Sequence, residues 1–151
     1  MSGPPALRRP MPAPSPLTQP FWDAAREHRL VIQRCRTCRT YYHPPVPECF
    51  HCLASGDAST LRFEPVSGRG VIYTCTKIHT TRMGGFEGVT PYPLVYVALE
   101  EQPGLILCCN MPGTSWEELR VGAPVEVMFA DYAGATLPEF RLARPPAAGA
   151  R

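Results

Sequence analysis

Four cysteines in two close pairs constrain the fold of this chain more than any other feature. Cys35 and Cys38 form one Cys-x-x-Cys pair, Cys49 and Cys52 form the second, and ten residues separate the pairs. Two such pairs can bring four thiolates to one tetrahedral point, the arrangement that a structural zinc site needs. Iron held by the same four sulfurs is the alternative. Because protein sulfur fills every position, we expect the metal to be a scaffold rather than a catalyst.

The cysteine pairs do not suit the other common uses of cysteine. A redox dithiol uses one pair, and a disulfide framework is typical of small secreted chains. Residues 1–7 contain no apolar run of the kind found in signal peptides. No apolar stretch approaches the roughly 20 residues of a membrane span. We therefore expect a soluble, cytoplasmic protein with no membrane partner.

The remainder of the chain indicates a mainly β fold. A helix is expected over residues 17–28, with Thr18 as its cap and Pro20 in its first turn. Runs rich in β-branched and aromatic residues predict five short strands, and a capping box at 115–118 predicts a short helix, ending near Gly122, between the third and fourth. The strand runs are 71–78, 93–99, 105–110, 125–129 and 140–142. This order of elements matches a five-stranded OB-fold barrel.

Composition and the expected elements divide the chain into five segments. Residues 1–16, with six prolines, and residues 144–151 are expected to be disordered tails, because such segments bury too little apolar surface to offset their conformational entropy. Between the tails we expect an N-terminal helical segment at 17–33, a zinc ribbon at 34–60 and the OB-fold at 61–143.

A glycine-rich connection, residues 79–92, joins the first two expected strands. It is too long for a simple hairpin, and loops of this length are usually either functional or disordered. On an OB barrel this connection commonly contacts a ligand. Lys77, His79 and Arg82 lie in or near the loop and can meet a phosphate, although a solvated loop also explains them.

Charge does not indicate a nucleic-acid-binding arm. The formal net charge is only +2, and the basic residues are spread along the chain. Arg34, Arg36 and Arg39 interleave with the first cysteine pair. We expect them to compensate the negative charge of a four-thiolate zinc site, with phosphate binding as the alternative.

No set of residues suggests catalysis. Cys75, Cys108 and Cys109 fall inside expected strands, where cysteine is commonly a small buried hydrophobe. Cys108 and Cys109 are adjacent, so they must point to opposite faces of a strand. The sequence holds no Walker-type phosphate loop and no Gly-x-Ser-x-Gly motif.

The ordered part of the chain, from about residue 17 to residue 142, resembles a known family. Its motifs, in this order, resemble the zinc-ribbon and OB-fold proteins associated with acyl-CoA metabolism, formerly a domain of unknown function. The motifs are residues 21–22, 30–35, the paired cysteines, 67–73, 91–92, 97–100, 121–125 and 137–140.

The resemblance implies a rubredoxin-like zinc ribbon followed by an OB-fold, and it also implies a partner. Members form complexes with thiolase-superfamily proteins, including thiolases, aldolases that act on acyl-CoA side chains, and acyl-CoA synthases. The small protein would stabilise the partner and help form its CoA-substrate channel, while the catalytic groups belong to the partner. Candidate contacts to CoA or to the partner are Lys77, His79, Arg82 and Phe86. We expect their loop to lie beside the ribbon and to become ordered on association.

Two positions depart from the family pattern. The family usually has glycine after the first cysteine pair, where this chain has Arg39, and a proline or small residue after the third cysteine, where this chain has Phe50. An arginine forced to positive φ would cost on the order of 1 kcal/mol, which is small against structural zinc-binding energies.

Two other classes of function compete with this expectation. Zinc ribbons and OB-folds also serve as nucleic-acid-binding modules, but such modules generally combine a basic groove with exposed stacking aromatics. An independent enzyme that uses Cys75 or Cys108 would need a paired base, which the sequence does not indicate. We expect a non-catalytic subunit of a hetero-oligomer with a thiolase-like protein.

Overall fold

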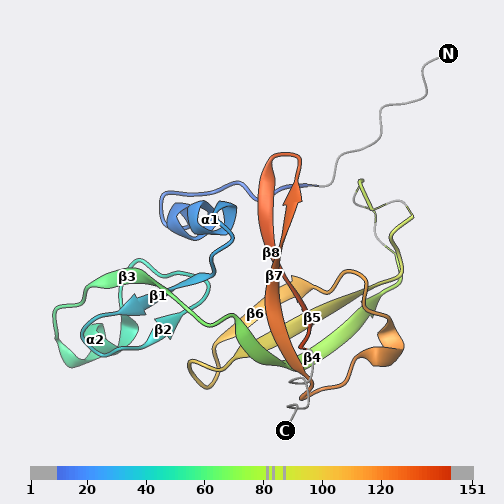
Figure 1. The fold of residues 1–151 in the computed structure, drawn as a ribbon. Helices are drawn as coiled ribbons and strands as arrows, with labels where there is room; N and C mark the ends of the chain where they lie inside the picture. Colours follow the sequence, from blue (N-terminus) through green and yellow to red (C-terminus); the bar gives the residue numbers. More distant parts are fainter. Residues whose placement is uncertain (1–9, 81, 83, 87, 144–151) are drawn as a thin grey trace, which may run out of the picture.

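The computed structural model describes residues 10–80, 82, 84–86 and 88–143. Its strands form two antiparallel sheets, one of three strands and one of five (Figure 1). The mainly β fold expected from the sequence is therefore confirmed. The elements follow the chain as α1 Gln19–Arg26, β1 Val31–Cys35, β2 Tyr41–Tyr42, α2 Phe50–Ser55, β3 Leu61–Pro65, β4 Arg69–Ile78, β5 Tyr92–Leu99, β6 Ile106–Asn110, the 3₁₀ turn η1 Trp116–Glu118, β7 Pro124–Tyr132 and β8 Ala135–Leu142.

The expected tails, 1–16 and 144–151, lie outside the described residues except for 10–16. Residues 10–15 have no helix or strand, and Pro12 and Pro14 line a small hollow together with Trp22 of α1. No helix in the described part of the chain has the length and apolar character needed to cross a membrane.

The apolar face of helix α1 positions it against the rest of the molecule. Pro20 lies in the first turn, as expected. Thr18 occupies the N-cap position, as expected, but its side chain bonds to no backbone N–H group of the helix. Its hydroxyl is hydrogen-bonded to the Ser15 hydroxyl at 3.1 Å instead. The buried residues of α1 are Phe21, Ala24 and Ala25.

Strand β1 is the centre of the three-stranded sheet, with β2 on one side and β3 on the other. Strand β3 stands where the OB-fold was expected to begin, but it pairs with β1 along its length, from Val31↔Pro65 to Cys35↔Leu61. This strand therefore belongs to the sheet that carries the first cysteine pair. A pattern of side chains predicts a strand without naming its neighbour, so the sequence did not reveal this pairing.

The five-stranded sheet has the order β6-β5-β4-β7-β8 and contains all five strands expected for the barrel. The helix expected between its third and fourth strands is only one 3₁₀ turn, η1. The capping box is present, since the Ser115 N–H donates to the Glu118 carboxylate at 2.8 Å. Leu119 is already extended, with ψ 132°, so the helix does not continue toward Gly122.

Two glycines at the start of β4 allow close approach of its neighbouring strands. Gly68 has φ +71°, and a Cβ there would lie 2.3 Å from Cγ1 of Val127 in β7. A Cβ on Gly70 would lie 2.3 Å from the carbonyl oxygen of Ala98 in β5. Real Cβ atoms essentially never approach so closely, so both positions require glycine.

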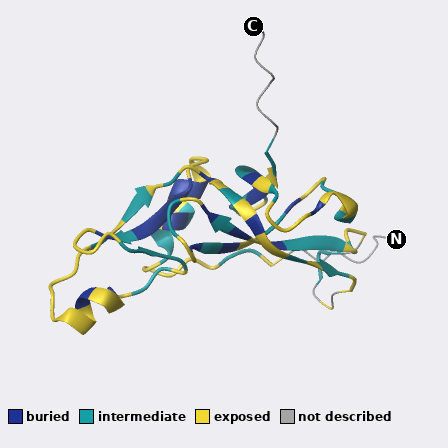
Figure 2. Cartoon of the chain, turned by 90° about the horizontal axis from the view of Figure 1, so that it is seen from below, coloured by how far each residue is buried: buried dark blue, intermediate teal, exposed yellow. Residues whose placement is uncertain are grey.

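The β7–β8 hairpin joins the barrel to α1. Strand β7 pairs with β4 only at residues 124–126, whereas it pairs with β8 at residues 125–132. The outer half of the hairpin therefore leaves the barrel and rises beside α1 (Figure 1). One hydrophobic cluster joins Phe21, Leu30 and Ile32 to barrel residues such as Ile72 and Phe140. The helix and β1 thus share a core with the barrel, and buried segments run through the middle of the molecule (Figure 2).

Candidate metal centre and the Glu139 cavities

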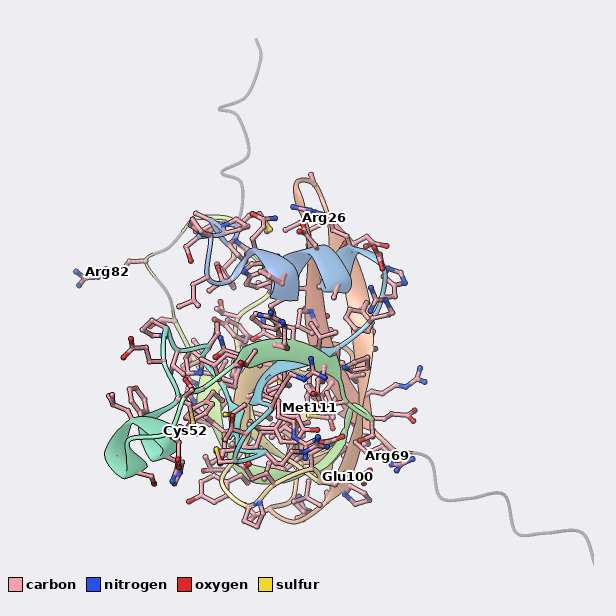
Figure 3. All side chains as sticks on the ribbon, turned by 90° about the vertical axis from the view of Figure 1, so that its left-hand side faces the viewer. Arg26, Cys52, Arg69, Arg82, Glu100 and Met111 are labelled. Carbon is pink, nitrogen blue, oxygen red and sulfur yellow. The ribbon has the colours of Figure 1, made fainter. Side chains whose placement is uncertain are left out.

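The four cysteines of the two pairs meet at one point. Cys35 ends β1, Cys38 follows in the next turn, Cys49 precedes α2 and Cys52 lies within α2. Their sulfur atoms all lie within 4.8 Å of one another, with 3.6 Å between Cys35 and Cys52 and 3.4 Å between Cys38 and Cys49. Sulfurs around a tetrahedral zinc ion, with Zn–S bonds of about 2.3 Å, would be about 3.8 Å apart. The donor set therefore fits structural zinc, and Figure 3 labels Cys52 at helix α2.

The electrostatics of the cluster call for a cation. Backbone hydrogen bonding at Cys38 lowers the pKa of Cys35 to about 6. Burial, together with hydrogen bonding to the Cys35 sulfur, raises the pKa of Cys52 to about 12. Without a positive charge, the four sulfurs do not become thiolates together near neutral pH. A bound zinc ion supplies that charge and cross-links the two cysteine pairs.

Residues between the two pairs pack around the sulfurs. The hydroxyl of Tyr42, in β2, lies 3.2 Å from the Cys49 sulfur, and the Cys38 sulfur lies 3.3 Å from the Thr40 hydroxyl. Burial, and then the hydrogen bond with Cys49, raises the pKa of Tyr42 to about 12. Tyr42 therefore stays a neutral phenol that can donate a hydrogen bond to a metal-bound sulfur.

Arg39 adopts the left-handed backbone conformation that the departure from the family glycine implied, with φ 68°. Its carbonyl accepts a hydrogen bond from Nε of Arg34 at 2.8 Å. The Arg34 guanidinium also lies 3.1 Å from the Glu64 carboxylate and 4.4 Å from the centre of the Tyr41 ring. Arg34 therefore stabilises the turn that follows the first cysteine pair through specific partners.

Two glutamines that the sequence pattern did not indicate hold the ribbon in place. Gln33, in β1, is buried, and its amide both accepts from the Val46 N–H at 2.7 Å and donates to the Val46 carbonyl at 3.0 Å. Gln102, in the turn between β5 and β6, makes the same pair of bonds with Tyr41, at 2.8 and 3.2 Å. The first clamp fixes the connection between the cysteine pairs, and the second ties the ribbon to the barrel. No motif or spacing in the sequence marks either residue.

Two cavities, of about 310 and 380 Å³, share Asn110 and Glu139 in their walls. The first lies against the 79–92 loop, and the second is an open hollow lined mainly by α1, β6 and β8. The Tyr132 hydroxyl donates to Oε1 of Glu139 at 2.8 Å, whereas Oε2 has no hydrogen-bond partner among the described residues. Glu139 is nevertheless only 2% exposed. Glutamate in a strand gives no sequence signal of such burial.

The candidate CoA or partner contacts are spread along the loop and its flanks. Lys77 is half-buried near the end of β4, while His79 and Arg82 are exposed, and Arg82 projects away from the body of the molecule (Figure 3). Phe86 stacks on Tyr92, with 5.5 Å between ring centres, and lines the smaller cavity. The expectation that the loop lies beside the ribbon is wrong, because the two are at opposite ends of the molecule (Figure 1). The barrel separates them.

The three remaining cysteines show no catalytic arrangement in their described contacts. Cys108 is exposed and Cys109 half-buried, as the expected alternation predicts. A hydrogen bond with Cys108 raises the pKa of Tyr96, and burial raises the pKa of Cys109. Cys75 packs against the hydrophobic core. Neither a phenol with a raised pKa nor an apolar neighbour can act as the base that a cysteine nucleophile needs.

Two family models match this chain in the order that the fold requires. One, described as "ChsH2, rubredoxin-like zinc ribbon domain", matches residues 22–57, and the other, "ChsH2, C-terminal OB-fold domain", matches residues 63–130. The chain belongs to the ChsH2 zinc-ribbon and OB-fold family. In this member of the ChsH2 family, the second match begins within β3, the strand that pairs with β1.

Relatives of this ChsH2-family chain carry names from acyl-CoA chemistry. A Thermomonospora curvata protein named "Probable enoyl-CoA hydratase alpha subunit" is 36% identical over 142 residues, which are 93% of this chain and 42% of the relative. The "3-oxo-4,17-pregnadiene-20-carboxyl-CoA hydratase alpha subunit" of Mycobacterium tuberculosis is 29% identical over 80% of this chain and 36% of its own length. The chain thus spans less than half of each of these two relatives.

In two further comparisons, the matched region covers most of this chain and most of the other protein. A "DUF35 domain-containing scaffold protein" of Pyrococcus furiosus is 31% identical over 72% of this chain and 74% of its own length. A chain in a solved structure titled "Ltp2-ChsH2(DUF35) aldolase" is 32% identical, with a TM-score of 0.76 over 87% of this chain and 98% of that chain. The zinc ribbon and OB-fold together therefore account for nearly all of a chain seen in that structure.

Proposed function

We propose that this chain is a non-catalytic, zinc-containing accessory subunit of an acyl-CoA-processing complex. It binds a thiolase-superfamily enzyme, stabilises it and helps to form the channel for the CoA-linked substrate. The observation that carries the proposal is the match to 98% of a chain in the Ltp2-ChsH2(DUF35) aldolase structure. The relatives are named as two acyl-CoA hydratase subunits and one scaffold protein. These names support a place in acyl-CoA metabolism and an accessory role.

The hydratase names do not transfer to this chain as an activity. The chain corresponds to 42% and 36% of the two hydratase subunits, so the hydratase groups of those proteins can lie in the remaining parts. In the described part of this chain, the metal centre already uses four cysteines, and the hydrogen bonds of Cys108 and Cys109 are with Tyr96 and with the Val95 carbonyl. A role as a subunit agrees with this inventory.

The exposed face of α2 is the surface that we assign to the protein partner. Phe50 is 58% exposed and Leu53 is 62% exposed, and both lie on a helix that the metal centre fixes in place (Figure 2). Neighbouring exposed large apolar residues on one rigid element can mark a protein interaction site. Arg82, at the other end of the molecule, is the residue best suited to a CoA phosphate, because its planar fork can donate two hydrogen bonds at once.

The partner surface is tested by co-expression with thiolase-superfamily proteins from the organism that encodes this chain. Size-exclusion chromatography with light scattering should reveal a hetero-oligomer. Replacing Leu53→Ser should weaken its assembly by about tenfold or more, because a central apolar contact is lost. Val121→Ser is the matched control, since Val121 is equally apolar and 69% exposed but lies in the turn before β7. Assembly that is absent in the wild type, or equal in both variants, would contradict the proposal.

The division of roles is tested by steady-state kinetics. The isolated chain should not turn over acyl-CoA substrates, and Arg82→Ala should raise the KM of the assembled complex for its CoA substrate while leaving assembly intact. Robust turnover by the isolated chain, lost on Cys108→Ala, would show that the chain is itself an enzyme. An unchanged KM in the Arg82 variant would show that Arg82 does not contact the CoA substrate.

A further inference from the structure

The carboxyl group of Glu139 is held in place at one oxygen and unsatisfied at the other. Oε1 accepts the 2.8 Å hydrogen bond from Tyr132, while Oε2 is buried and has no hydrogen-bond partner among the described residues. The ion pairs of the described residues use other carboxylates. A carboxylate only accepts hydrogen bonds, and a buried acceptor without a donor is unfavourable. Oε2 of Glu139 therefore lacks a hydrogen-bond donor that the described residues do not provide.

The larger cavity offers this carboxyl group an apolar, aromatic approach. Its volume is about 380 Å³, within the usual range of small-ligand sites. Phe21 and Trp22 of α1 form one wall, Leu107 of β6 lies in another, and His43 and Glu139 complete it. Burial lowers the pKa of His43, so this imidazole is neutral at neutral pH and brings no positive charge to the cavity. The Phe21 and His43 rings are 5.6 Å apart, which closes this side of the cavity.

We propose that the cavity between α1, β6 and β8 binds an aliphatic ammonium or guanidinium group, with Glu139 as its anchor. Such a cation donates the missing hydrogen bond to the carboxylate and neutralises a charge that has no ion-pair partner among the described residues. Its alkyl stem matches the leucine and proline side chains of the cavity, and the aromatic side chains of Phe21 and Trp22 in the lining suit a cation. Neutral donors satisfy the oxygen but not the charge. The cation is either a free amine or a lysine or arginine side chain of a partner protein.

Titration of the isotopically labelled full chain with n-butylamine, followed by backbone amide NMR, tests the site. We expect saturable shifts at the amides of residues 108–110, 137 and 139, and an affinity about tenfold or more above that of 1-butanol, which has the same shape without the charge. Glu139→Gln should abolish this preference while keeping nearly the same side-chain volume. Glu117→Gln, at an exposed glutamate of η1, should leave it unchanged.

The outcomes separate the proposal from its alternatives. Equal binding of amine and alcohol to the wild type, or no saturable shifts at these residues, overturns the site without reference to any variant. An unchanged preference in the Glu139 variant does the same. If n-butylamine and Glu139→Gln also weaken the hetero-oligomer, the cation comes from the partner; if assembly is unaffected, it is a free ligand. Failure of the hetero-oligomer to form would contradict the accessory-subunit proposal and leave the amine titration valid.

Discussion

The side-chain amide of Gln102 hydrogen-bonds to both backbone groups of Tyr41, accepting from its N–H at 2.8 Å and donating to its carbonyl at 3.2 Å. Tyr41 belongs to β2, the outer strand of the ribbon sheet, while Gln102 lies in the turn between β5 and β6. The glutamine therefore occupies the place of a further strand on the free side of β2. It is a direct polar link between the metal-binding ribbon and the barrel.

Replacing Gln102→Ala should lower the free energy of unfolding by about 1–3 kcal/mol, because two half-buried backbone groups lose their partners. Denaturant unfolding followed by circular dichroism measures the change. Gln19→Ala is the control, since the Gln19 amide donates to the exposed Asp23 side chain at 2.7 Å, and it should change stability by less than about 0.5 kcal/mol. Equal effects of the two substitutions would show that the clamp contributes nothing.

The metal centre should contain about one zinc ion per chain, because four sulfurs converge on one point. Replacing Cys49→Ser should abolish tight binding and unfold residues 34–60, while the β4–β8 sheet keeps its own core. Elemental analysis and amide NMR follow the two effects separately. Cys75→Ser, outside the cluster, should retain the metal. Finding iron instead of zinc would confirm a metal site but correct the identity of the metal. Absence of both metals would refute the metal site.

Arg39→Gly should increase zinc affinity by up to about fivefold, because glycine relieves a left-handed conformation that costs a side-chain-bearing residue on the order of 1 kcal/mol. Competition with a chromophoric chelator measures this affinity. Arg36→Gly is the control. Arg36 has the same charge as Arg39 and is also exposed, but it is not among the positive-φ residues of the described chain. It should not increase affinity. A comparable gain in both variants would trace the effect to charge instead of backbone strain.

Asp131, in β7, should make stability depend on pH at the acid end. Hydrogen bonds from Thr136, at 2.7 Å, and then from His28, at 3.2 Å, lower the pKa of Asp131 below its ordinary value of 3.8. A lowered pKa means that the folded protein favours the carboxylate, so the contribution is complete above the ordinary value and is lost as pH falls through the lowered one. Asp131→Asn should therefore be less stable than the wild type at pH 7.

The difference in stability between the Asp131 variant and the wild type should shrink as pH falls below about 4, where the wild type progressively loses the same charge. Thermal unfolding across this range measures it. Thr136→Val, which removes the largest cause of the shift, should reduce the same dependence. Unfolding temperatures that differ by a constant amount at every pH would mean that the carboxylate contributes no pH-dependent stability.

Local patterns in the sequence were sufficient to identify the metal centre and the strands of the barrel. The spacing of Cys35, Cys38, Cys49 and Cys52 restricts four sulfurs to short turns, so the cluster needs little information from elsewhere in the chain. The five barrel strands follow from runs of β-branched and aromatic residues, because a pleated strand places alternate side chains in a core wherever its neighbours lie. Even the unusual backbone of Arg39 follows from its place in the first cysteine turn.

Only the tertiary structure decided which segments meet. The pairing of β3 with β1 and the Gln102–Tyr41 clamp join residues far apart in the sequence, and no local pattern specifies such a partner. The separation of the 79–92 loop from the ribbon depends on how the barrel is placed between them (Figure 1). Glu139 pairs with Met128 in the β7–β8 register and lines two cavities. Its sequence position alone does not indicate this placement. Burial and contact depend on how the sheets pack as a whole, so the type of a single residue does not predict them.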